Sequence, residues 1–266
     1  MELKTPCRFE SGRRYYLNPC ISIGYPDITA LLMTKYKLIV FLSLFFVIIL
    51  NLAWIKPIPR LFVIGDSISI QYGPYLESYL DGIVAYERKR DDGNAEANLD
   101  VPTGANGGDS RMVLAYLRAK LQDPNFKPDF LMLNCGLHDI KREPESNQIQ
   151  VEKNEYRQNL ELIIELLHEN NIRILWIRTT PVVDRIHNHN RTSFHRYSAD
   201  LKEYNQIADE VFIKHEIPMI DLHGFTEHLG EEAYIDHVHF SESARNLQAS
   251  FLAGYLASYI QKNFHR

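Results

Sequence analysis

The sequence predicts an α/β fold over residues 57–266, in which helices cover both faces of one parallel sheet. Short apolar runs alternate along this region with longer stretches whose apolar residues recur three and four positions apart. Strands that are apolar throughout indicate a sheet buried on both faces, because a sheet with one wet face alternates apolar and polar residues. We therefore expect a doubly wound parallel sheet, preceded by one N-terminal transmembrane helix.

The first half of this region carries two strong strand signals and one helix signal. Leu61–Ile64 is a β-rich run stopped by Gly65, and Ile83–Glu87 is a weaker strand candidate. The apolar residues of 113–121 fall at helical spacing, and Phe130–Leu133 indicates a buried strand.

The second half repeats the alternation. Apolar residues at helical spacing predict helices around 160–167, 201–212 and 247–260. Ile172–Ile177 and Ile217–Ile220 are the strands predicted between them. Since no repeat or low-complexity linker interrupts the pattern, we expect one domain at 57–266, with binding loops at 88–110 and 181–198.

An apolar run of 18 residues, Leu38–Ile55, precedes this domain. As a helix it is long enough to cross a hydrocarbon core of about 30 Å. The alternative is a cleaved signal peptide, but Asn51-Leu-Ala53 fits the small-residue pattern of a cleavage site poorly. We expect an uncleaved single-pass membrane anchor, with the domain on the exported (periplasmic or extracellular) side.

Residues 1–37 form the tail before this run. A chain read from Met33 begins Met-Thr-Lys-Tyr-Lys and then turns apolar, which is the layout of an export signal. Residues 1–32 are thus either a short cytoplasmic tail or an over-extended start.

Charge divides the chain at the same place. Seven basic and three acidic residues give residues 1–56 a charge of +4, whereas the remaining 22 basic and 31 acidic residues give 57–266 a charge of −9. An acidic domain is a poor partner for nucleic acid, whose binding depends on neutralised phosphates.

A serine, a histidine and an aspartate follow strand ends, where the sites of open α/β sheets form. Ser67 follows the first strand and needs a base to become a nucleophile. His239 is that base, and Asp236, three residues earlier, orients its ring. His237 is the rival for the base and Asp221 for the acid. Each motif alone is equally typical of a helix cap.

These residues resemble the motif blocks of the SGNH (GDSL-type) hydrolases, which are esterases and acylhydrolases. Gly65-Asp66-Ser67-Ile68 matches the first block, Gly107-Gly108-Asp109-Ser110 looks like the second, and Asp236-x-x-His239 matches the last. The resemblance extends over about 60–260. It implies a three-layer, flavodoxin-like sheet, the triad Ser67, Asp236 and His239, and oxyanion donors at the N–H groups of Ser67 and Gly108, with no cofactor.

The third block departs from the family pattern Gly-x-Asn-Asp. Here the chain reads Gly136-Leu137-His138-Asp139, with His138 in the place of the oxyanion-binding Asn. A neutral imidazole has one N–H to donate, so we expect His138 to be the third oxyanion donor, oriented by Asp139 or by a backbone carbonyl. The alternative is that His138 only packs, and that Ser67 and Gly108 form the hole alone.

The histidines His187, His189 and His195 of the 181–198 loop raise the question of a metal site, since His-x-His is a ligand spacing. We expect them to face solvent or substrate, and we expect no metal. The function predicted is hydrolysis of an ester, such as an O-acyl group on a glycan or a lipid. A membrane-anchored O-acyltransferase with the same triad, or a catalytically inactive binding protein, are the alternatives.

Overall fold

The computed structural model describes residues 28–53, 58–90, 95, 98–190, 193–236 and 238–264. The chain divides between Lys56 and Pro57 into two units, of which the second extends to Arg266. The tail at 1–27 and residue His237 lie outside the described residues.

Helix α1, Ile28–Ala53, is the described part of the first unit. It contains the predicted anchor Leu38–Ile55 except for its last two residues, which lie outside the described ones. In the part of the chain that the structure describes, no helix is both long enough and apolar enough to span a bilayer. The predicted transmembrane anchor is therefore not supported, whereas location on the exported side stays a prediction.

The second unit contains a five-stranded sheet in the order β2-β1-β3-β4-β5, and every pair is parallel. Its strands are β1 (Arg60–Ile64), β2 (Ala85–Arg88), β3 (Phe130–Leu133), β4 (Arg173–Ile177) and β5 (Met219–Ile220). The chain adds β2 on one side of β1 and β3 on the other. The crevice beyond the ends of β1 and β3 is therefore the switch point at which such sheets bind ligands.

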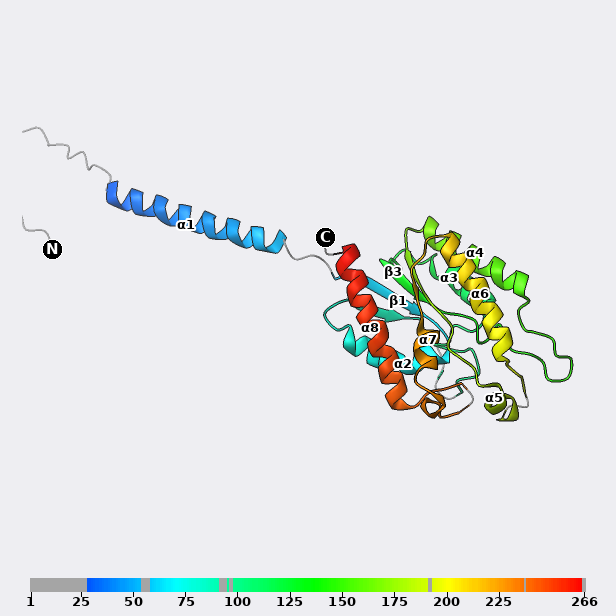
Figure 1. The fold of residues 1–266 in the computed structure, drawn as a ribbon. Coiled ribbons are helices and arrows are strands. Elements are labelled where there is room, and N and C mark those ends of the chain that lie inside the picture. Colours follow the sequence, from blue (N-terminus) through cyan, green and yellow to red (C-terminus); the bar gives the residue numbers. More distant parts are fainter. Residues whose placement is uncertain are drawn as a thin grey trace, which may run out of the picture. The chain divides into compact units, whose positions relative to one another are not determined.

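Helices cover both faces of the sheet, which confirms the α/β prediction (Figure 1). On one face α2 (Ser67–Tyr79) packs against α8 (Glu242–Phe264), which also contacts the short α7 (Leu222–Glu227). On the other face α4 (Lys153–Glu169) packs between α3 (Ser110–Lys120) and α6 (Ser198–Lys214). A 3₁₀ turn, Glu231–Ala233, precedes α8.

The core lies between the layers. All four residues of β3 are buried, and the Trp176 ring of β4 stacks on Phe212 of α6 at 4.3 Å. Several described elements differ from the sequence prediction, among them α7, which was not predicted. The last strand is confined to β5 because Pro218 has no N–H to donate to a sheet ladder. The loop predicted at 181–198 contains a helix, α5 (Asp184–Asn190).

Candidate active site

Ser67 is the first residue of α2 and lies just beyond the end of β1. Asp66 caps the helix, since its Oδ1 accepts the Ile68 N–H at 3.0 Å. Gly65 permits the tight turn between strand and helix, because a Cβ there would lie 2.7 Å from the Cβ of Ser69. The Ser67 hydroxyl therefore sits at a helix N-terminus, where backbone N–H groups favour negative charge.

A continuous chain of hydrogen bonds runs from Ser67 to Asp236. The Ser67 Oγ lies 3.0 Å from the His239 Nε2, and the His239 Nδ1 lies 2.7 Å from the Asp236 Oδ2. The second oxygen of Asp236 accepts the backbone N–H groups of Val238 at 2.9 Å and of His239 at 2.8 Å. The Asp236 carboxylate thus fixes both the turn at 236–239 and the orientation of the His239 ring.

These bonds fix the charge of the carboxylate. Burial raises the pKa of Asp236, but the hydrogen bonds from the His239 ring and from the backbone of Val238 and His239 outweigh it. The pKa of Asp236 therefore lies well below its usual range. An ionised carboxylate at this position is the partner that an orienting acid in a serine–histidine–aspartate arrangement must provide.

Gly108 uses its N–H within its own loop. It has a positive φ of 72°, and its N–H donates to the Asn106 Oδ1 at 3.0 Å. A side chain is excluded here, because a Cβ would lie 2.5 Å from the Met112 Sδ. Donation to an oxyanion requires the N–H to be shared with Asn106 or released from it, and this role stays a prediction.

His138 is buried, 1% exposed, in the turn after β3. Burial lowers the pKa of His138 well below its usual range, and the charges of Lys141 and Arg196 lower it further, so the ring is neutral. The orientation predicted for the ring is not found. Within the part of the chain that the structure describes, the His138 Nδ1 has no hydrogen-bond partner, whereas Asp139 accepts the Ser110 N–H at 2.9 Å.

The sequence profile of the GDSL-like Lipase/Acylhydrolase family matches residues 63–245, which is more than half of the chain and includes every residue of this site. The chain belongs to that family. Its resemblance to the GDSL-type hydrolases is thereby confirmed, and it is a serine ester hydrolase.

Solved structures of lipases and esterases share the fold. A lipase/acylhydrolase from Enterococcus faecalis is 18% identical, with a TM-score of 0.56 over 76% of this chain and 96% of that one. An acetyl xylan esterase is 17% identical, with a TM-score of 0.54 over 74% and 99%. A carbohydrate acetylesterase from Sinorhizobium meliloti is 14% identical, with a TM-score of 0.52 over 76% and 99%. No curated protein matches the chain significantly.

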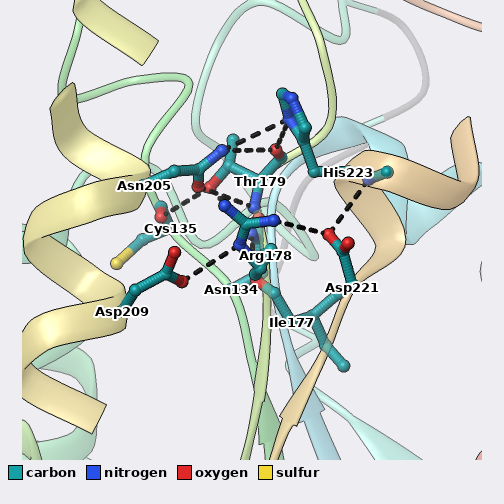
Figure 2. A network of polar contacts seen from close by, with 10 residues as sticks. Asn134, Cys135, Ile177, Arg178, Thr179, Asn205, Asp209, Asp221 and His223 are labelled. Atoms are coloured by element: carbon teal, nitrogen blue, oxygen red, sulfur yellow. Dashed lines mark hydrogen bonds and ion pairs between the residues drawn. The ribbon is translucent and has the colours of Figure 1, made fainter. Parts of the chain in front are cut away.

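In this GDSL-type hydrolase, a network of hydrogen bonds connects the residues just before the third motif block, Gly136–Asp139, with the segment after β4 and with α6 (Figure 2). Thr179, which follows β4, donates its hydroxyl to the Cys135 carbonyl at 3.1 Å and accepts the Asn134 side chain at 3.1 Å. Asn205 of α6 pairs with the Thr179 backbone, accepting its N–H at 3.2 Å and donating to its carbonyl at 3.0 Å. Neither Thr179 nor Asn205 is among the site residues predicted from the sequence.

Asp221, the rival for the catalytic acid, belongs to the outer part of this network. Its Oδ1 caps α7 by accepting the Gly224 N–H at 3.0 Å and pairs with Arg178 at 2.7 Å, and Arg178 also pairs with Asp209 at 3.0 Å (Figure 2). These bonds give Asp221 a structural task. The rival base, His237, lies outside the described residues.

Arg196 is not among the site residues predicted from the sequence. It lies in the 181–198 loop but is buried, 2% exposed, and its Nε donates to the Leu137 carbonyl at 2.6 Å. Its charge lowers the pKa of His138 and opposes the rise that burial causes in the pKa of Asp66. Nothing in the sequence distinguishes this arginine from one on a solvated loop.

His189 and His195 form no metal cluster among the residues that can be described, and the side chain of His187 lies outside them. Within the described part of the chain, no three His, Cys, Asp or Glu side chains meet as a metal ion would require. The backbone of His195 pairs instead with Arg142, with N···O distances of 2.8 and 2.9 Å. That the reaction needs no metal stays a prediction.

Proposed function

We propose that the chain hydrolyses small O-acyl esters of carbohydrate through a covalent acyl-enzyme on Ser67, with His239 as general base and Asp236 as its orienting acid. The observation that carries this proposal is the unbroken pair of contacts, 3.0 Å from Ser67 to His239 and 2.7 Å from His239 to Asp236. Serine ester hydrolysis requires a nucleophile, a base and an orienting group that contact one another in this order.

In the first half-reaction the Ser67 Oγ attacks the ester carbonyl carbon while the His239 Nε2 takes the hydroxyl proton of Ser67. The tetrahedral intermediate collapses when the imidazolium returns this proton to the departing alcohol oxygen, which leaves Ser67 acylated. In the second half, His239 takes a proton from water as the water oxygen attacks the acyl carbon. Collapse of that intermediate returns the proton to Ser67 and releases the carboxylic acid.

The oxyanion of both intermediates is proposed to accept the N–H groups of Ser67 and Gly108 and the ring N–H of His138. Support comes from the start of α2 at Ser67 and from the neutral state of His138. A neutral ring donates without bringing a second positive charge beside the imidazolium of His239. Each such donor contributes about 10²–10³ in rate.

A small acyl group is supported by the burial of the site. Ser67 is 4% exposed and His239 2%, so little surface is open for a long chain at the nucleophile. A carbohydrate as the alcohol is supported by two structures of the same fold, whose names are acetyl xylan esterase and carbohydrate acetylesterase. A lipid ester is the outcome that a chain-length series would reveal instead.

The test combines activity with covalent labelling. The purified protein should hydrolyse 4-nitrophenyl acetate faster than the octanoate or palmitate ester, and should release acetate from acetylated xylan. Ser67→Ala should lose this activity with an unchanged circular dichroism spectrum, because only the attacking oxygen is removed. A fluorophosphonate should add to the wild type and not to Ser67→Ala.

Labelling of the Ser67→Ala variant at another serine would overturn the assignment. The same assay with free sugars separates hydrolysis from transfer. Release of acetate into water supports the proposal, whereas formation of an acetylated sugar in its place would establish an acyltransferase.

A further inference from the structure

Asp139 joins the two segments that carry the proposed oxyanion donors. It follows His138 directly, and its Oδ1 accepts the Ser110 N–H at 2.9 Å. Ser110 begins α3, two residues after Gly108. One hydrogen bond therefore connects the Gly108 segment to the His138 segment, which are 29 residues apart in sequence at this bond.

Both ends of this bond are held firmly. The Ser110 hydroxyl accepts the Asn159 side chain of α4 at 2.9 Å, and the Asp139 carbonyl accepts the Val151 N–H at 3.1 Å. Ser110 and Asp139 are each 0% exposed. A substitution at either residue thus displaces the backbone segment, because solvent does not reach either residue to replace the lost hydrogen bond.

The ring of His138 depends on this connection. Its Nδ1 has no hydrogen-bond partner among the described residues, so no bond at this atom holds the ring. The backbone on either side of His138 is tied instead: the Leu137 carbonyl accepts the Arg196 Nε at 2.6 Å, and the Asp139 carboxyl group accepts the Ser110 N–H. On the other side, Gly108 is held by its bond to Asn106 and by the helix that Ser110 begins.

A buried carboxyl group at this position carries a cost. Burial raises the pKa of Asp139 to about 7, the hydroxyl and N–H of Ser110 lower it, and the charge of Asp109 raises it. The other ionisable groups that interact with it are also acids, Cys135 at the end of β3, Tyr156 of α4 and Tyr204 of α6. Burial raises the pKa of all three, so they stay neutral at neutral pH. A packed apolar side chain would avoid this desolvation cost.

We propose that Asp139 is a positioning residue whose carboxyl group fixes the separation of the Gly108 and His138 segments and so shapes the oxyanion hole. This inference rests on the proposed function. Asp139 acts through its neighbours and does not touch the reacting atoms.

Removal of the carboxyl group should lower kcat with little change in KM, because the hole acts on the transition state. Asp139→Ala should lose about 10²-fold in kcat, the effect of one misplaced donor, and should keep KM within about twofold. Asp139→Asn keeps a carbonyl oxygen that accepts the Ser110 N–H, and should recover kcat to within about fivefold of the wild type.

The pH profile gives a readout that a purely structural role would not move. A carboxylate accepts the Ser110 N–H more strongly than a protonated acid does. Since burial raises the pKa of Asp139 to about 7, the kcat profile of the wild type should contain a step for this group in addition to that of the proposed base. The step should be missing in Asp139→Asn.

The donor side can be tested independently at Ser110. Proline is favoured at the first position of a helix, so Ser110→Pro removes the donated N–H while preserving the start of α3. Ser110→Ala removes only the hydroxyl and keeps the N–H. Ser110→Pro should match Asp139→Ala in kcat, and combining the two should add little. Ser110→Ala loses the hydroxyl contact with Asp139 but keeps the N–H, so it should lose less kcat than Ser110→Pro.

Asp129 provides the matched control. Its Oδ2 accepts the Arg60 N–H at 2.7 Å, which is the same type of bond between distant segments, but at the opposite end of β1. Asp129→Ala should keep the kcat of the wild type, even where its melting temperature changes. Should Asp139→Ala fail to fold, the pH profile of Asp139→Asn and the two Ser110 variants decide the matter.

Two results would overturn the inference: an Asp139→Asn profile with as many ionisation steps as the wild type, or a Ser110→Pro variant with the kcat of Ser110→Ala. Neither result bears on the proposed function. That function is overturned instead if Ser67→Ala retains the activity of the wild type.

Discussion

A single side chain, Asp236, organises most of the local chemistry. Its Oδ1 closes the turn by accepting two backbone N–H groups, and its Oδ2 holds the His239 ring. Because the two residues are three positions apart, this pair is formed locally. Only the approach of Ser67, which is 172 positions from His239, requires the whole fold.

His138 is the residue at which this chain departs from its family, and it carries the first prediction. His138→Ala should lower kcat by about 10²–10³ with little change in KM, because one oxyanion donor is lost. His138→Asn should recover part of this loss through its amide N–H. An active His138→Ala with normal kcat and a reduced melting temperature would show that the ring only packs.

The depressed pKa of His138 makes a second, thermodynamic prediction. As pH falls below about 6.5, the unfolded chain binds a proton at this histidine before the folded protein does. The wild type should therefore lose stability from this group toward acid pH, and that loss should be absent in His138→Asn. The difference in melting temperature between the two proteins, measured from pH 7 to pH 5, should shift in favour of the variant. A constant difference would contradict a buried, neutral ring.

Among the elements, the segment after β3 is shaped by contact with the segment after β4. Gly136 has a φ of 152°, and a Cβ there would lie 2.6 Å from the Thr179 Oγ1. Thr179 is fixed in turn by Asn134 and Asn205 (Figure 2). The position of His138 thus depends on bonds made two strands away from Ser67.

Gly136→Ala should therefore lower both stability and kcat. The clash with Thr179 forces the segment to shift, at a cost of about 1–3 kcal/mol, and His138 moves with it. Gly82→Ala is the control, because Gly82 also has a positive φ, 71°, but a Cβ there meets nothing within 4 Å. It should lower the melting temperature and leave kcat unchanged. Equal kcat values for the two variants would separate Gly136 from catalysis.

For the whole molecule, the order of the strands decides where the site lies. The switch between β1 and β3 brings the ends of these strands to one crevice, and the family match at 63–245 lies entirely within the second unit. We predict that residues 57–266 expressed alone unfold in one cooperative transition and keep the kcat of the full chain. Thermal unfolding and the 4-nitrophenyl acetate assay check this. A large loss of kcat would assign a catalytic contribution to the first 56 residues.

The last prediction concerns metals. A mechanism based on serine, histidine and aspartate supplies its own nucleophile and base, so prolonged treatment with a chelator should leave kcat and KM unchanged. Recovery of a lost activity by zinc or manganese would instead indicate a metal site at the loop histidines.

The sequence by itself determined the α/β fold class, most of the strands and helices, and the family. Buried strands such as Phe130–Leu133 were recognisable because a sheet covered on both faces leaves no polar position. Ser67, Asp236 and His239 were recognisable because short motifs carry them. The membrane helix expected at Leu38–Ile55 is not supported among the described residues.

Only the tertiary structure decided what each polar group binds. The bond between Asp139 and Ser110 and the burial of Arg196 against Leu137 both depend on packing between segments distant in sequence. Local sequence sets which hydrogen bonds a residue is able to make. Burial removes the competing water, and the arrangement of neighbouring strands and helices then selects among those bonds.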